Sequence, residues 1–143
     1  MEGLTFYELP DEQAYIAKFC EIYKDGINTP DGFSIVCLYP EKTAKHFCCG
    51  GENRKFQKSR AARIGWAKYI LLNVNRRKIL LDTSTKNIIF FFEKGRTAYA
   101  VVCAPRVDSR LNLITGFLVK GQRAEKYRLA KPPYQFYAIK KSC

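Results

Sequence analysis

The sequence has a single histidine, and beyond residue 42 it has only five acidic residues against 22 basic ones. It contains no P-loop, GxGxxG, HExxH or GxSxG motif, so no motif supports an NTPase, a dinucleotide enzyme, a metalloprotease or a serine hydrolase. No stretch approaches the roughly 20 consecutive apolar residues that a membrane helix needs. The first residues lack the basic region and apolar run of a secretion signal. We therefore expect a soluble, cytoplasmic protein.

Metal-binding patterns are also missing. His46, Cys48 and Cys49 lie close together, but there is no CxxC and no second ligand pair at a zinc spacing. A two-metal nuclease needs clustered carboxylates, whereas the acidic residues of the basic part are scattered. These residues are Glu52, Asp82, Glu93, Asp108 and Glu125. We expect no metal and no cofactor, and reduced thiols rather than disulfides at the six cysteines.

Positive charge is what the chain has in excess, and it is sorted along the length. The net charge is +12; residues 1–42 carry a balance of −5 and the remainder carries +17. A surface this positive repels itself and is not needed for folding. A polyanionic partner that neutralises this surface would explain the excess of positive charge, and nucleic acid is the commonest candidate. A membrane surface is the other candidate, but with no anchor in sight we expect no membrane partner.

Hydrophobic residues make up 47% of the 143, which is enough to bury a core. We expect one domain over residues 1–143, with an acidic helical segment at 1–32 and a basic core at 33–143. Apolar spacing predicts an amphipathic helix over residues 11–23. Further elements expected before residue 75 are a strand at 33–39, a short helix at 41–49 closed by Gly50 and Gly51, and a longer helix at 60–73 with Ser59 as its N-cap.

Four strand-like runs rich in Ile, Phe, Val and Leu come next. They are residues 78–81, 87–93, 97–104 and 111–119. Consecutive strands with short links predict an antiparallel meander. Helices before such a meander predict an α+β fold, with N-terminal helices packed on a four-stranded or slightly larger antiparallel sheet. Residues 121–141 are strongly basic, and the sequence assigns them no structure.

His46 is the first candidate for chemistry. It lies between Lys45 and Phe47, and cationic neighbours lower an imidazole pKa, which keeps more of the ring neutral and able to accept a proton near pH 7. A structural or idle histidine is the alternative. Arg60 and Arg63 lie about one helical turn apart, so both guanidinium groups could meet one phosphate. On the same helix Lys68 would flank that face, and a solvated helix face is the alternative.

Thr115 is a hydroxyl in an apolar strand, beside a glycine. Strand propensity alone explains a threonine there, but Gly116 can mark the close approach of a ligand or another backbone. The basic residues after this strand could follow a phosphate backbone, and the tyrosines there could stack on nucleobases. Alternatively, they could be ordinary surface and core-capping residues. The candidate substrate-binding residues are Lys45, Lys68, Arg123, Tyr127, Arg128 and Tyr137.

The order of these features resembles the phage-associated branch of the barnase–EndoU–colicin–RelE-like ribonuclease superfamily. The likeness rests on Arg60-Ala61-Ala62-Arg63-Ile64-Gly65-Trp66-Ala67, Tyr99-Ala100-Val101-Val102 and Leu113-Ile114-Thr115-Gly116-Phe117-Leu118-Val119. It covers about residues 33–137. Two departures loosen it: Gly65 stands where a proline is common, and Gly116 where an alanine is common.

The resemblance implies two helices on a four-stranded antiparallel sheet, with an RNA-cutting site on the open sheet face. The implied site residues are His46, Arg60, Arg63 and Thr115. The implied activity is a metal-independent endoribonuclease, a toxin-like effector of bacterial or phage origin, with tRNA among its candidate targets. RNA is then the expected partner, and an acidic immunity or antitoxin protein is a further candidate.

In the expected reaction a base removes the ribose 2′-hydroxyl proton, and that oxygen attacks phosphorus, expels the 5′-oxygen and leaves a 2′,3′-cyclic phosphate. Such a reaction requires RNA. His46 would be the general acid or base, the arginines would stabilise the phosphorane, and Thr115 would bond a phosphate oxygen. Lys68 or Tyr137 would handle the second proton. Two alternatives stay open: a non-catalytic nucleic-acid-binding module, and a small inhibitor of a nucleic-acid-handling machine.

Overall fold

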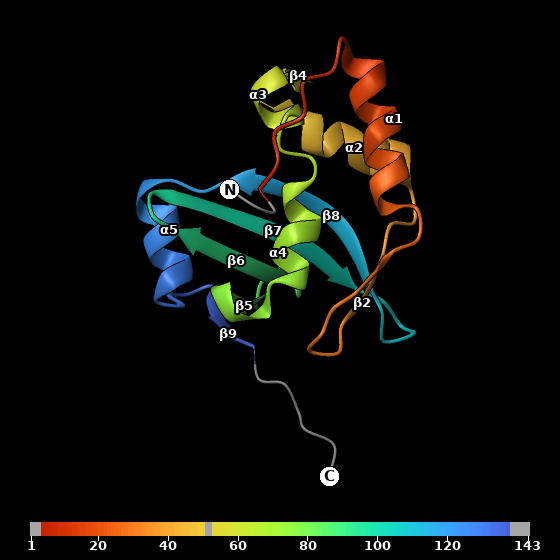
Figure 1. Ribbon diagram of the computed structural model, residues 1–143. Coiled ribbons are helices and arrows are strands. Elements are labelled where there is room, and N and C mark those ends of the chain that lie inside the picture. The colour runs from red at the N-terminus through yellow and green to blue at the C-terminus, as the bar shows by residue number, and fades with distance from the viewer. Residues whose placement is uncertain (1–3, 51–52, 138–143) are drawn as a thin grey trace.

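The computed structural model describes residues 4–50 and 53–137 and shows a mixed α+β protein (Figure 1). Its helices are α1 (Glu12–Tyr23), α2 (Pro40–Cys48), α3 (Lys58–Ala61), α4 (Trp66–Leu72) and α5 (Gly121–Arg128), with a 3₁₀ turn, η1, at Val74–Arg76. Its strands are β1 (Ile27–Asn28), β2 (Ser34–Val36), β3 (Cys49–Gly50), β4 (Lys55–Phe56), β5 (Arg77–Asp82), β6 (Ile88–Lys94), β7 (Thr97–Pro105), β8 (Leu111–Leu118) and β9 (Tyr134–Phe136).

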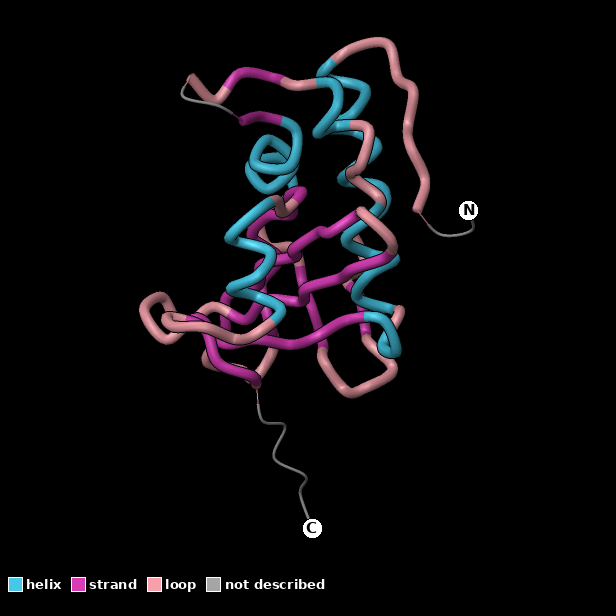
Figure 2. Tube along the Cα trace, turned by 90° about the vertical axis from the view of Figure 1, so that its left-hand side faces the viewer, coloured by secondary structure: helices cyan, strands magenta, loops and turns pink. Residues whose placement is uncertain are grey.

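Within the described residues, seven strands form one sheet in the order β1-β2-β8-β7-β6-β5-β9. The predicted meander is confirmed, because β5, β6, β7 and β8 pair antiparallel in sequence order. The sheet is larger than four strands: β9 extends one edge antiparallel, and β2 joins the other edge parallel to β8. The β3–β4 hairpin lies apart from this sheet, near the top of Figure 2.

Both faces of the sheet carry a hydrophobic core, which is why every residue from Ile88 to Phe92 is buried. Side chains alternate along a strand, so Phe90 and Phe92 pack with the core under α1, α2 and α4. Ile89 and Phe91 instead pack with Ala124 and Tyr127 of α5. The face without N-terminal helices is therefore covered by α5 over β5 to β7, rather than left open as the resemblance implies.

The predicted N-terminal helix is confirmed as α1. Asp11 caps its start, with Oδ1 accepting the Ala14 N–H at 2.8 Å. Gly26 follows its end with φ +72°, a left-handed conformation that favours glycine. Tyr15, Phe19 and Tyr23 are buried against the rest of the core. The acidic N-terminal segment thus contributes a core helix to the fold.

The single helix predicted over residues 60–73 is wrong, because the chain forms two short helices, α3 and α4. The hydroxyl of Tyr23 donates to the Ile64 carbonyl and accepts the Lys68 N–H at 3.1 Å. In an unbroken α-helix those two backbone groups would bond each other, so the hydroxyl is inserted into the ladder. Gly65, a poor helix former, lies in the break. The N-cap is Gln57 rather than Ser59.

Other boundaries also differ from the predictions. The strand expected at residues 33–39 is only β2, which ends at Val36, and α2 begins at Pro40. Gly51, expected to close that helix, lies outside the described residues. The unassigned basic region forms α5 and β9. In residues 4–50 and 53–137, no helix combines the length and apolar character that crossing a membrane requires.

Replacing Tyr23 with phenylalanine tests the inserted hydroxyl. The change leaves the buried Ile64 carbonyl and Lys68 N–H without their partner, so we expect the free energy of unfolding to fall by about 1–3 kcal/mol. Urea denaturation followed by circular dichroism measures it. Tyr69→Phe is the matched control, because its half-buried hydroxyl serves only the Asn73 side chain. Equal losses in the two variants would contradict the bridging role.

Candidate functional site

Arg60 and Arg63 line one cavity of about 190 Å³, which we call the site cavity. It is bounded by α3 and the turn after it, by β7 and by the C-terminal end of β8. The remaining lining residues are Gln57, Ser59, Tyr99, Gly116, Phe117, Leu118 and Lys120. None of the carboxylates in the described part of the chain is among them. The cavity therefore has only positive formal charge at its wall.

The Arg60 side chain has a hydrogen-bond partner at Nη2 but none at Nε. Its Nη2 donates to the main-chain carbonyl of His46 at 2.9 Å, while its Nε is buried without a hydrogen-bond partner. A β-carbon at Gly50 would lie 2.9 Å from Arg60 Cδ, so glycine there leaves room for the side chain. The guanidinium group is thereby fixed in place, and its buried Nε–H has no hydrogen-bond partner.

Arg63 is fixed in a different way. Its Nη1 donates to the Ser59 carbonyl at 2.6 Å. Its guanidinium carbon lies 5.3 Å from the ring centre of Phe6 and 5.2 Å from that of Trp66, within the range of cation–π contacts. Its Nε is also buried and unpartnered.

These two Nε atoms are the only buried side-chain nitrogen or oxygen atoms without a hydrogen-bond partner among the described residues. Leaving a buried donor unbonded costs about 1–3 kcal/mol, more for a charged group. Native proteins keep few such groups, and those they keep call for an explanation. Here both atoms belong to cationic residues that line the same cavity.

Tyr99 adds a hydroxyl to this cavity. Burial raises its pKa well above the ordinary value, although Arg60 and Arg63 oppose the shift. The hydroxyl therefore stays protonated at neutral pH and can donate a hydrogen bond. A β-carbon at Gly116 would lie 2.6 Å from Tyr99 Oη and 2.7 Å from Phe47 Cε2. The space at this glycine is taken by those two side chains, rather than by the ligand or second backbone that the sequence suggested.

His46 is not among the residues that line the site cavity. The residue is half-buried on α2, and its Nδ1 is 3.4 Å from Arg54 Nη1. Burial, then Arg54, then Lys42 lower the imidazole pKa below its ordinary value of 6.5. The neutral ring is therefore favoured at pH 7. Arg60, which lines the cavity, bonds the main-chain carbonyl of this residue.

Thr115 does not line the site cavity with Arg60, Arg63 and Tyr99. It pairs with Val102, whereas Leu113 pairs with the next residue of β7, Cys103. Two steps along β8 therefore match one step along β7, which is a β-bulge that moves Thr115 to the opposite face of the sheet from Leu113. Val102 packs with the core on the α5 side, so Thr115 faces that side, away from Tyr99.

The predicted substrate-binding residues are dispersed. Lys45 is exposed on α2, and Lys68 is exposed on α4, where it lines a separate cavity near Tyr7. Tyr127 is 1% exposed and packs against Phe91, so its ring presents no stacking face.

The other three predicted residues also lie outside the site cavity. Arg123 lies over the Phe117 ring at 5.1 Å, and Arg128 pairs with Glu93 at 2.6 Å. Tyr137 is half-buried, with its ring 5.9 Å from that of Phe33. Sequence reasoning did not assign a role to Tyr99, Lys120 or Phe6. Only the alternation of β7, with Tyr99 two residues before buried Val101, signals an inward-facing ring there.

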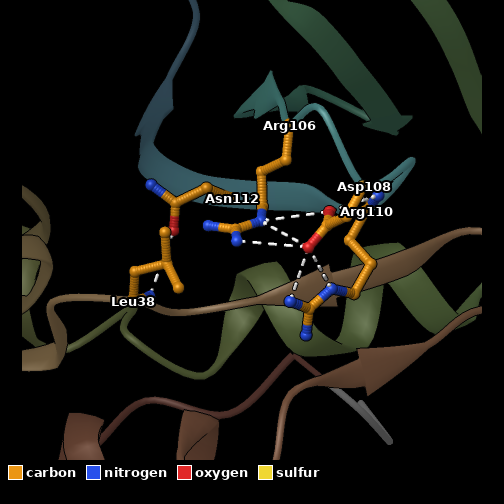
Figure 3. A network of polar contacts seen from close by, with 5 residues as sticks. All are labelled: Leu38, Arg106, Asp108, Arg110 and Asn112. Atoms are coloured by element: carbon orange, nitrogen blue, oxygen red, sulfur yellow. Dashed lines mark hydrogen bonds and ion pairs between the residues drawn. The ribbon is translucent and has the colours of Figure 1, made fainter.

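Several other basic side chains form ion pairs with carboxylates. In the β7–β8 loop, Asp108 accepts from Arg106 and Arg110 (Figure 3). Those hydrogen bonds, the Arg110 bond first, hold the pKa of the Asp108 carboxyl far below its ordinary value. Asn112, next to this network, accepts the Leu38 N–H and ties the loop before α2 to β8 (Figure 3). The Asp108 carboxylate is thus paired with arginines of its own loop, and it does not line the site cavity.

The residues considered for zinc are placed as follows. Cys48 is buried, and burial raises its thiol pKa to about 12. Cys49 Sγ lies 3.9 Å from Glu12 Oε1. Across the two described stretches, no three His, Cys, Asp or Glu side chains gather as a metal-binding group, and the five cysteines described there are free thiols.

Comparisons with known proteins add nothing to this geometry. No protein-family model matches the chain, and no curated protein or solved structure matches it. The likeness to the ribonuclease superfamily accordingly rests on the short motifs given above. Function is inferred here from the site itself.

Arg54→Ala tests the electrostatics around His46. The change removes a positive charge beside Nδ1, and less repulsion favours the protonated ring, so we expect the imidazole pKa to rise. Proton NMR titration reads this directly because His46 is the only histidine. Lys24→Ala, which removes an exposed charge at the end of α1, should leave the titration unchanged. A pKa that stays constant in Arg54→Ala would show that Arg54 does not act on the ring.

Proposed function

We propose that this protein is a metal-independent ribonuclease that holds a phosphate group of RNA between Arg60 and Arg63. The supporting observation is that Arg60 and Arg63, whose buried Nε atoms are the two without a hydrogen-bond partner in the described chain, are both residues that line the same cavity. Phosphate oxygens are strong acceptors that bond two guanidinium groups well. The +17 balance of residues 43–143 supplies the long-range attraction for a polyanion.

The site offers three fixed donors to one phosphate. Arg60 Nε, Arg63 Nε and the Tyr99 hydroxyl could each bond a non-bridging oxygen, and Lys120 adds a positive charge at the same wall. Carbonyl and aromatic contacts hold the guanidinium groups near the place where charge builds on the phosphorane. Such preorganised stabilisation is usually the largest contribution to catalysis. In this proposal Tyr99 takes the hydrogen-bonding role first expected of Thr115.

His46 is the proposed base. Its lowered pKa favours the neutral ring at pH 7, which can accept the ribose 2′-hydroxyl proton. The 2′-oxygen then attacks phosphorus, the bond to the 5′-oxygen breaks, and a 2′,3′-cyclic phosphate forms. Lys68 and Tyr137 do not line the site cavity, so water supplies the proton to the leaving oxygen. A toxin-like role, a tRNA substrate and an acidic antitoxin are extensions of this proposal.

A non-catalytic RNA-binding module is the second candidate. One observation favours it: the ring of His46 contacts Arg54 and does not line the site cavity. In that case the same arginines would hold a phosphate without a base close enough to start the reaction. Tight, salt-dependent binding with no product would distinguish this candidate.

Incubating the protein with total RNA or a tRNA pool in EDTA separates the two functions. We expect fragments ending in 2′,3′-cyclic phosphate, and a rate lowered about 10²-fold or more by His46→Ala, because proton transfer is lost. Filter binding should show that His46→Ala still holds RNA, and Lys24→Ala serves as the matched control. Binding without cleavage by the unmodified protein would support the binding module, and cleavage abolished by EDTA would exclude the metal-independent route.

A further inference from the structure

Lys120 is one of the residues that line the site cavity. That residue also lines a cavity of about 480 Å³, the turn cavity, formed by the β6–β7 turn and the start of α5. Glu93 in turn lines both the turn cavity and a third cavity of about 510 Å³, the strand cavity, which includes Arg76 and Lys78. The three hollows therefore adjoin one another through shared wall residues.

This series of cavities passes from one face of the sheet to the other. Tyr99, in the site cavity, belongs to the core on the α1–α4 side, whereas Phe91, in the strand cavity, belongs to the core on the α5 side. The turn cavity lies between them at the β6–β7 turn, where β8 ends and α5 begins, on the left of Figure 1. The path thus rounds the end of the sheet.

Basic side chains follow the whole path. Lys120, Arg96, Arg76 and Lys78 are exposed along it. Lys78 Nζ donates to the Arg128 carbonyl at 3.2 Å, which joins the turn and strand cavities. Glu93 is the one carboxylate among the residues that line the three cavities, and it is already paired with Arg128. Arg77 also lines the path, but its side chain is buried in an ion pair with Asp31 and does not contribute a free charge to the path.

We propose that these cavities form one track for single-stranded RNA, which runs from the site cavity around the β6–β7 turn to the α5 side. This inference rests on the proposed function and adds where the strand beyond the bound phosphate lies. A line of separated cations suits a chain with one negative charge per nucleotide. Duplex nucleic acid is stiff over about 150 base pairs and bends only at a cost, whereas a single strand can round the end of a sheet.

The test compares two paired variants on short and long RNA. Arg76→Ala/Arg96→Ala removes two charges from the track and none from the site cavity. Lys24→Ala/Lys126→Ala is the control, since all four residues are exposed. Lys126 lies two positions, about 200° of helix, beyond Ala124 of the turn cavity and so points away from it. The ligands are 2′-O-methyl RNA of three and of twelve nucleotides, which lack the attacking hydroxyl and stay intact.

We expect the track variant to bind the twelve-nucleotide RNA about tenfold more weakly at low salt. Its slope of log affinity against log salt should fall by about 1.4, which is about 0.7 for each of two lost phosphate contacts. Binding of the three-nucleotide RNA and cleavage of a dinucleotide should match the unmodified protein. The control variant should match it on both lengths.

The track would be contradicted if the track variant kept the salt slope of the unmodified protein, or if the control variant lost as much affinity for the twelve-nucleotide RNA. It would also be contradicted if polyglutamate competed as effectively as RNA of equal charge. That result would indicate an acidic protein as occupant. The proposed function is tested separately on the short RNA. If Arg63→Ala leaves its binding unchanged, the phosphate site fails, whatever the long RNA does.

Discussion

The hydroxyl of Tyr23 joins the acidic N-terminal helix to the part of the chain that carries the site. By taking both the Ile64 carbonyl and the Lys68 N–H, it separates α3 from α4. Arg60 then belongs to α3, while Arg63 belongs to the turn that follows and lies over the rings of Phe6 and Trp66. Without that break the two guanidinium groups would sit on one helix face and lose these separate supports.

The distribution of carboxylates explains why the site cavity stays positive. Asp31 is bonded to Arg77, Asp108 to Arg106 and Arg110, and Glu93 to Arg128. Each of these acids lies away from Arg60 and Arg63, whose N–H groups bond only carbonyl oxygens in the described residues. A cavity whose described lining holds fixed, partly desolvated cations and no carboxylate is prepared for an external anion.

Local patterns predicted much of the fold. The apolar spacing of α1 and the four strand-like runs gave the right elements because short-range periodicity determines them. The break at residues 62–65 depends on a hydroxyl about 41 residues away in sequence, which no local window contains. The bulge opposite Val102 and Cys103 reversed the face of Thr115, and α5 took Tyr127 into a core. Arg60 and Arg63 were paired on the assumption of one unbroken helix, but they line the same cavity from α3 and the turn after it, and Tyr99 joins them only through tertiary packing.

The central claim is that the buried Nε–H groups of Arg60 and Arg63 bind one phosphate. Nitrogen-15 NMR of the arginine side chains, titrated with a 2′-O-methyl dinucleotide, observes those groups directly. We expect both Nε–H signals to shift together and to exchange more slowly with water, while the Arg106 signal, already bonded to Asp108, stays unchanged. If the signals of Arg60 and Arg63 do not move at saturating dinucleotide, the cavity does not hold phosphate and the account is wrong.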